Sequence, residues 1–150
     1  MRILIDADGC PVVDISVKLA KKHHIECLIL CDTAHVFNKD GAETLTFSKG
    51  ADSVDYALVN RVNAGDFVIT QDYGLAAMCL ARRAVVLNQD GMEYTSDNID
   101  ALLLARHTAK KIRNSGSRLK GPPKRCEEQN AAFENALDHL LSGIPPIKEN

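Results

Sequence analysis

The chain has 150 residues, 45% of them hydrophobic and 25% charged, which excludes wholesale disorder and fits one domain with a sizeable core. No apolar run approaches the roughly 18–20 residues of a membrane span, and the opening MRILID does not resemble a signal peptide, so we expect a cytoplasmic protein without a membrane partner. The formal net charge of −2, taken alone, argues against a nucleic-acid partner. That sum hides a segregation, because residues 106–125 hold eight Lys and Arg and no acid, which leaves 10 basic and 20 acidic residues elsewhere.

Apolar runs that alternate with helical patterns predict a repeated β-α-β arrangement. The predicted strands are 3–5, 27–31, 44–47, 67–70 and 84–87. The predicted helices are 11–24, 49–63, 75–83, 95–113 and 127–141. This order is typical of a three-layer α/β/α fold with a doubly wound, mostly parallel sheet of about five strands, followed by C-terminal helices.

The cysteines point to reduced thiols rather than to a disulfide framework or a zinc site. Their number, 5, is odd, and no two of them form a C-x-x-C pair. Cys27, Cys31 and Cys79 lie in apolar segments. We expect these three side chains to be buried and free, as is usual in a cytosolic protein.

The last third of the chain predicts a basic loop between two helices of one single domain. Gly121, Pro122 and Pro123 forbid regular structure there. The final helix carries an apolar stripe from Phe133 to Leu141, which docks on the core or on a partner and is compatible with a homodimer. We therefore divide the chain into an α/β core, 1–113, a basic loop, 114–126, and a C-terminal helix and tail packed on the core, 127–150.

Carboxylates follow two of the predicted strands and begin one helix. Asp6 and Asp8 come after the first strand, Asp72 comes after the fourth, and Asp52 and Asp55 share one face of the helix between them. Ligands bind beyond the carboxyl ends of strands in such sheets, and right-handed crossovers commonly make these two strands neighbours. Gathered carboxylates repel one another, and a divalent cation relieves that repulsion; all-oxygen ligands suit Mg²⁺ or Mn²⁺. The alternative is that each acid only caps a helix or a turn.

The same residues carry a resemblance to known families. DAD at 6–8, KGAD at 49–52 with Asp55, and VITQD at 68–72 resemble, in that order, the PIN-like superfamily of metal-dependent ribonucleases, especially its NYN branch. Over nearly its full length the chain resembles more closely the bacterial YaiI/YqxD family. The supporting stretches include DADGCPV at 6–12, VITQDYGL at 68–75 and RLKGPPKR at 118–125.

The resemblance implies a PIN-like fold and metal-dependent hydrolysis of phosphodiesters. Asp6, Asp8, Asp52 and Asp72 match the metal ligands, with Mg²⁺ or Mn²⁺ as the cofactor. Asp55, like Asp8, is implied as a supporting ligand or as the base for the attacking water. Thr70 is implied to orient the loop that carries Asp72.

The basic segment is the candidate phosphate-binding surface. Its charged side chains can neutralise phosphates, and few aromatic residues are interleaved for base stacking, so we expect phosphate contact without sequence readout. The resemblance to PIN-like ribonucleases implies RNA as the partner. The alternative is a solvated basic face that pairs with the acidic body. The residues assigned to nucleic-acid binding are Arg113, Arg118, Lys120, Lys124 and Arg125.

Two other functions compete with the nuclease. Asp6-x-Asp8-Gly9 is also how haloacid-dehalogenase phosphatases begin, with the first Asp as nucleophile and the second as acid. Those enzymes usually have Thr or Val where Cys10 stands. They also need a Lys and a downstream pair of acids, and directly after the fifth predicted strand this sequence has only Asp90, without a neighbouring acid. The other alternative is a non-catalytic RNA-binding or adaptor module that keeps the PIN-like fold.

Overall fold

The computed structural model describes residues 1–32, 39–48, 53–114, 116 and 124–143. Its centre is a six-stranded sheet in the order β3-β2-β1-β4-β5-β6. The first five strands are parallel, and β6 runs antiparallel to β5 at the edge. The strands are β1 (Arg2–Asp6), β2 (Glu26–Asp32), β3 (Glu43–Phe47), β4 (Phe67–Ile69), β5 (Val85–Leu87) and β6 (Glu93–Tyr94).

The central strand β1 shows why this sheet is covered on both sides. Ile3, Leu4 and Ile5 are completely buried. Successive side chains of a strand point to opposite faces, so Ile3 and Ile5 join one apolar cluster and Leu4 joins the other. A continuous apolar run of this kind is typical of a parallel strand between two layers of helices.

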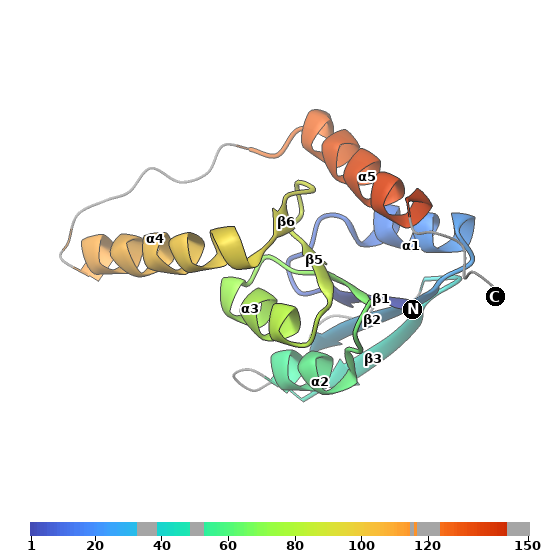
Figure 1. The fold of residues 1–150 in the computed structure, drawn as a ribbon, viewed down its shortest axis with the longest axis horizontal. Coiled ribbons are helices and arrows are strands. Elements are labelled where there is room, and N and C mark those ends of the chain that lie inside the picture. The colour runs from blue at the N-terminus through green and yellow to red at the C-terminus, as the bar shows by residue number, and fades with distance from the viewer. Residues whose placement is uncertain (33–38, 49–52, 115, 117–123, 144–150) are drawn as a thin grey trace.

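The helices form the two outer layers, as Figure 1 shows. One apolar cluster joins the sheet to α1 and α5, and the other joins it to α2, α3 and the start of α4. The predicted three-layer α/β/α fold with a mostly parallel sheet is therefore confirmed. The helices are α1 (Val13–Lys22), α2 (Ser53–Arg61), α3 (Tyr73–Ala81), α4 (Ser96–Asn114) and α5 (Glu127–Ser142).

Helix α5 returns to the body of the molecule and packs against α1. Phe133, Leu137 and Leu141 are buried in the same cluster as the apolar side chains of α1. Gly91, in the turn before β6, lies against the middle of α5, where an added Cβ would be 2.8 Å from the Cβ of Ala136. The predicted stripe on the last helix thus faces the core of its own chain.

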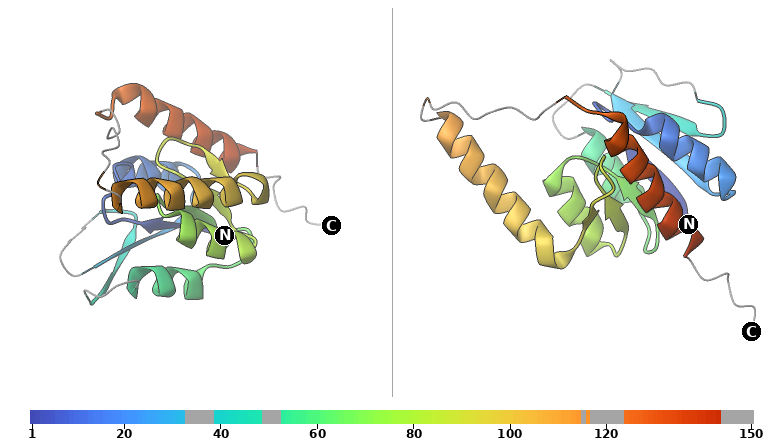
Figure 2. Two further views of the ribbon diagram at one scale, coloured as in Figure 1. Left: turned by 90° about the vertical axis from the view of Figure 1, so that its left-hand side faces the viewer. Right: turned by 90° about the horizontal axis from the view of Figure 1, so that it is seen from above.

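Helix α4 differs from the others because, within the described part of the chain, its apolar cluster residues all lie in its first half. In this first half the side chain of Ile99 is buried, and those of Leu102 and Leu103 are partly buried. From Leu104 to Thr108 every side chain is exposed, and both figures of the fold show the helix extending away from the sheet (Figures 1 and 2).

Smaller differences from the sequence-based boundaries have local causes. Helix α1 begins at Val13, two residues after Pro11, and α3 begins at Tyr73 because Asp72 caps it. Strand β6, only two residues long, was not predicted. Cys27, Cys31 and Cys79 are buried thiols that form no disulfide, as expected. No helix of the described residues is long and apolar enough to cross a membrane.

Candidate functional site

The candidate site lies where the chain leaves β1 and β4 at the same edge of the sheet. Because β1 and β4 are parallel neighbours with Ile5 paired to Ile69, the next residues, Asp6 and Thr70, come side by side. The Thr70 hydroxyl donates a 2.8 Å hydrogen bond to Asp6 Oδ2. Strand order reverses between these two strands, which is where ligands bind in doubly wound sheets.

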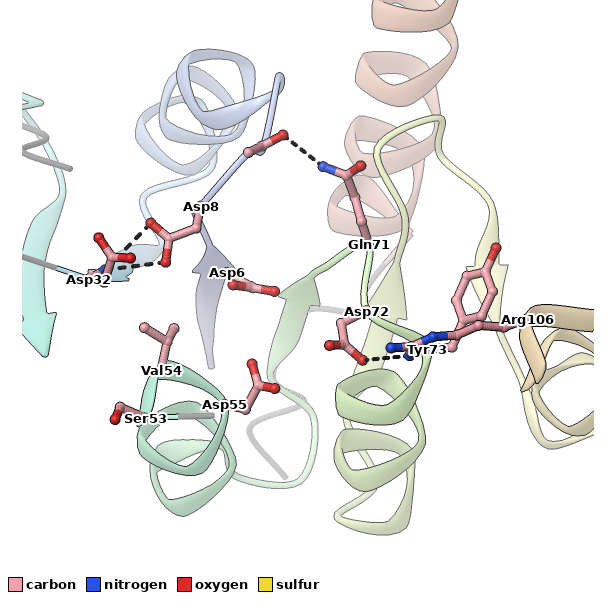
Figure 3. Close-up of a pocket in the computed structure, with 11 residues that line it drawn as sticks. Asp6, Asp8, Asp32, Ser53, Val54, Asp55, Gln71, Asp72, Tyr73 and Arg106 are labelled. Carbon is pink, nitrogen blue, oxygen red and sulfur yellow. Dashed lines mark hydrogen bonds and ion pairs between the residues drawn. The ribbon is translucent and has the colours of Figure 1, made fainter. Parts of the chain in front are cut away.

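A cavity of about 640 Å³ opens at this edge. Figure 3 shows five carboxylates around it, contributed by β1 and the loop that follows it, β2, α2 and the start of α3. The acidic residues that line it are Asp6, Asp8, Asp32, Asp55 and Asp72. The other described lining residues are Gly9, Ser53, Val54, Gln71, Tyr73 and Arg106.

The carboxylate of Asp6 is unfavourably placed for ionisation. Burial raises its pKa from 3.8 to about 6, the Thr70 hydrogen bond opposes the shift, and the charges of Asp55, Asp8 and Asp72 add to it. Removal from water disfavours the ionised carboxylate, and each neighbouring negative charge disfavours it further. Near neutral pH the cavity therefore holds a carboxylate that is costly to ionise.

Thr70 fixes the loop that joins β4 to α3. Its side chain is almost fully buried, at 1% exposure. Its oxygen accepts a hydrogen bond from the Asp72 backbone N–H at 3.0 Å while its hydroxyl donates to Asp6. The Tyr94 hydroxyl donates to the Thr70 carbonyl at 3.3 Å. Thr70 thus connects the two acids that leave neighbouring strands.

Asp72 has two kinds of contact. It caps α3, since its Oδ1 accepts from the backbone N–H groups of Gly74 at 2.8 Å and Leu75 at 3.1 Å. The same oxygen lies 3.6 Å from the Arg106 guanidinium of α4. The capping role considered for Asp72 is therefore real, and it holds the carboxylate at the rim of the cavity.

Asp8 and Asp32 form the side of the cavity next to β2. The Asp8 carboxylate accepts from the Asp32 backbone N–H, at 3.2 and 3.4 Å to its two oxygens (Figure 3). Asp32 was missed in the sequence, although it ends β2 as Asp6 ends β1. The signal was present, because β2 is the other parallel neighbour of β1.

Asp55, in the first turn of α2, lines the same cavity and contributes to the raised pKa of Asp6. Asp52, the remaining predicted ligand, lies outside the described residues. The structure thus brings together Asp6, Asp8, Asp55 and Asp72 beside Thr70. Their assignment as metal ligands or catalytic groups stays a prediction.

Arg106 is the single positively charged side chain among the described residues that line the cavity. It was counted in the basic segment but not assigned to the site, because nothing in the sequence says how far along α4 the cavity extends. Gln71, also unassigned, donates through Nε2 to the Gly9 carbonyl at 2.9 Å and so ties the loop after β1 to the loop after β4.

Arg125, predicted to bind nucleic acid, makes its contacts within the chain. Nη1 lies 2.7 Å from Asp90 Oδ1, Nη2 donates to the Gln89 carbonyl at 2.6 Å, and Nε donates to Asn130 Oδ1 at 2.8 Å. Lys124 is exposed. Arg118 and Lys120 lie outside the described residues, as does the side chain of Arg113.

The donor set suits a hard divalent cation, since carboxylate oxygens are the ligands that Mg²⁺ and Mn²⁺ prefer. No three His, Cys, Asp or Glu side chains of the described residues are close enough together to hold an ion as they stand. A metal would therefore have to draw carboxylates together, with Asp72 exchanging its contact with Arg106 for the ion.

The fold and the cavity define an α/β protein with an acidic pocket at the switch point of a parallel sheet. Its family is established by comparison: the profile described as "Uncharacterized BCR, YaiI/YqxD family" matches residues 4–143. The chain belongs to this family, as its sequence suggested.

Several relatives share almost the full length of the chain. A UPF0178 protein of Exiguobacterium sibiricum is 50% identical, over 95% of this chain and 97% of its own. A UPF0178 protein of Alkaliphilus oremlandii is 46% identical, over 94% and 91%, and one of Ruminiclostridium cellulolyticum is 50% identical, over 91% and 90%. No solved structure matches the chain.

Proposed function

We propose that the protein is a metal-dependent phosphodiester hydrolase, with RNA as the expected substrate and Mg²⁺ or Mn²⁺ as the cofactor. One observation carries the proposal: carboxylates from β1, β2, α2 and the start of α3 converge on one cavity at the switch point of the sheet. The resemblance of the DAD, KGAD and VITQD stretches to PIN-like ribonucleases supports the same function.

The electrostatics of the cavity favour a cation. Burial, together with the charges of the neighbouring acids, raises the pKa of Asp6 to about 6, so the carboxylates of the cavity resist full ionisation. A divalent cation would remove that resistance, because an opposite charge favours the carboxylate form. We assign Asp6, Asp8 and Asp72 to metal binding, together with Asp52.

The reaction class is attack of a water oxygen on phosphorus, with cleavage of the bond from phosphorus to the leaving oxygen. A bound divalent cation supplies a water of lowered pKa and stabilises charge on the phosphate and the leaving oxygen. In this chain Asp55, which lines the cavity from the first turn of α2, is our candidate to take the proton from the water. Thr70 holds Asp6 and the Asp72 loop in register.

The proposal is tested with purified protein, a labelled RNA oligonucleotide, and Mn²⁺ or Mg²⁺ against EDTA. Asp72→Asn is the informative variant, because Asn also caps helices well and the fold of α3 is retained. We expect the rate of cleavage to fall at least about 100-fold. Even the loss of a residue that only contacts a metal ligand typically lowers metal affinity or activity by about 10–100-fold.

Asp100→Asn is the matched control, because Asp100 is an exposed acid on α4 outside the cavity lining. Equal cleavage by Asp72→Asn and the wild type would show that the site is wrongly assigned. RNA binding without metal-dependent turnover in the wild type would favour the non-catalytic module.

The phosphatase alternative has less support in the cavity. That chemistry needs a lysine beside the nucleophilic Asp, and the described lining residues include no lysine. Trapping of a covalent aspartyl-phosphate at Asp6 would reverse this preference.

A further inference from the structure

We propose that the projecting half of α4 is the binding surface for a nucleic-acid strand, which contacts Lys110 and Arg106 on its way into the acidic cavity. This inference rests on the proposed function and names its substrate class: an oligonucleotide rather than a small phosphoester. It also places the phosphate contacts on α4, outside the loop around residues 118–125.

The first step is the position of α4 relative to the cavity. Arg106 lines the cavity and faces Asp72 at 3.6 Å, so the middle of α4 forms part of the rim. From there the helix continues away from the sheet, as Figure 1 and the right-hand view of Figure 2 show. A strand that leaves the cavity beside Arg106 therefore meets the exposed side of α4.

The second step is charge. Residues 101–114 contain no Asp or Glu, and Arg106, Lys110 and Lys111 are all exposed. Arg106 and Lys110 are four residues apart, so they share one face of the helix at a rise of about 6 Å. Basic residues are also common at the C-terminal end of a helix, where they interact favourably with the helix dipole. That effect is limited to the last turn, so it does not explain Arg106 in the middle of α4.

The third step is the size of the ligand. A cavity of about 640 Å³ accepts a group of roughly drug size. The rest of a polymeric substrate then lies outside it. The charged side chains among the described residues that line the cavity are all acidic apart from Arg106. The phosphates outside the cavity therefore need cations elsewhere, and α4 provides them next to the opening.

Arg125 does not serve this purpose as it stands. All three of its guanidinium nitrogens are engaged by Asp90, Gln89 and Asn130. A phosphate would have to displace these contacts, whereas Lys110 is exposed at the surface of α4. Of these two residues, Lys110 is therefore the one whose charge is available to a phosphate.

The test compares Lys110→Gln with the wild type in two assays. Binding of a fluorescent single-stranded RNA is measured by anisotropy in EDTA at several salt concentrations. Each lost phosphate contact should lower the slope of log K against log salt by about 0.7. Turnover is measured with Mn²⁺ on the same RNA and on bis(4-nitrophenyl) phosphate. Lys and Gln have similar helix propensity, so α4 is retained.

We expect Lys110→Gln to weaken RNA binding, to flatten its salt dependence and to raise KM for RNA, with hydrolysis of the small diester unchanged. Arg82→Gln is the matched control, since Arg82 is an exposed cation at the C-terminal end of α3, towards the opposite edge of the sheet. It should match the wild type in every assay.

The outcomes separate the two proposals. The surface is refuted if wild-type protein does not bind RNA, or if Lys110→Gln binds it with the same affinity and salt slope. Failure of the wild type to hydrolyse either substrate, with RNA binding that still depends on Lys110, refutes the hydrolase and retains the surface.

Discussion

Asp6 is a residue whose ionised side chain lowers the stability of the fold, because its surroundings disfavour the charged form. It ends the strand β1 directly after the completely buried residues Ile3, Leu4 and Ile5, and the charges of three other acids act on its carboxylate. The hydrogen bond from Thr70 relieves only part of this cost, because burial is the largest influence on its pKa. Strain of this kind is typical of functional sites, where shifted pKa values concentrate.

The first stability prediction concerns Asp6→Asn in the metal-free protein. Because the pKa of Asp6 is raised to about 6 in the fold, the folded state holds its proton where the unfolded state has lost it. The free energy of unfolding should therefore fall as pH rises from about 4 to about 6. Above that range Asp6→Asn should be more stable than the wild type by about 3 kcal/mol.

Urea unfolding at a series of pH values, with EDTA present, measures this difference. The two proteins should be equally stable at low pH, where Asp6 is protonated in both states. Asp100→Asn should follow the wild type throughout. A difference that is constant with pH would show that Asp6 is not the titrating group.

The residues of the site differ in how well the sequence revealed them. Asp6, Asp8 and Asp72 follow strands, and the rule that ligands bind beyond the carboxyl ends of strands brought them together. Asp32 obeys the same rule but ends a second strand without a motif around it. Arg106 could not be found, because its role depends on where α4 passes the cavity.

At the scale of elements, α5 is held by two different contacts. Its apolar stripe is buried against α1, and its first turn is tied to the turn before β6 through Arg125. Periodicity predicted the stripe and the helix boundaries to within a residue. It could not show that Arg125 reaches Asp90, 35 residues earlier in the sequence.

Arg125→Gln should therefore lower the stability of the protein more than it lowers RNA binding. Loss of the contacts to Asp90, Gln89 and Asn130 should cost about 1–2 kcal/mol, because the pair is only partly buried. Thermal unfolding of Arg125→Gln and of Lys124→Gln, an exposed neighbour, measures the effect. The opposite pattern, unchanged stability with strongly reduced RNA binding, would show that Arg125 binds phosphate, as the sequence predicted.

Helix α4 shows what element-level prediction leaves open. Its length and its apolar residues Ile99, Leu102 and Leu103 were predicted correctly. Periodicity reports which face of a helix is apolar, and it does not report where the neighbouring layer ends. The projection of the second half follows from the short α3, which has only 9 residues against 19 in α4.

At the scale of the whole molecule, the net charge of −2 is the sum of two opposed regions. The carboxylates gather in the cavity, and the exposed cations of α4 begin at its rim. Each region alone would repel or attract ions strongly over about one Debye length, roughly 8 Å at physiological salt. Their adjacency suits a ligand that combines a divalent cation with a chain of phosphates.

The adjacency leads to a prediction for the folded protein as a whole. Mn²⁺ at about 100 times its Kd should stabilise the wild type by about 2.7 kcal/mol, which raises Tm by about 5–10 °C for a chain of this size. Asp6→Asn should melt above the wild type in EDTA and gain little from Mn²⁺, because the substitution that relieves the repulsion also removes a ligand.

Calorimetry in EDTA and in Mn²⁺ at matched ionic strength distinguishes this from general screening. Added NaCl also weakens repulsion between carboxylates, but it acts on exposed charges throughout the molecule. Its effect on stability should therefore be the same in the wild type and in Asp100→Asn, and it should not depend on the Asp6 carboxylate. A Mn²⁺ response of equal size in Asp6→Asn would place the ion elsewhere. A response that NaCl reproduces would mean that the cavity is acidic without being a metal site.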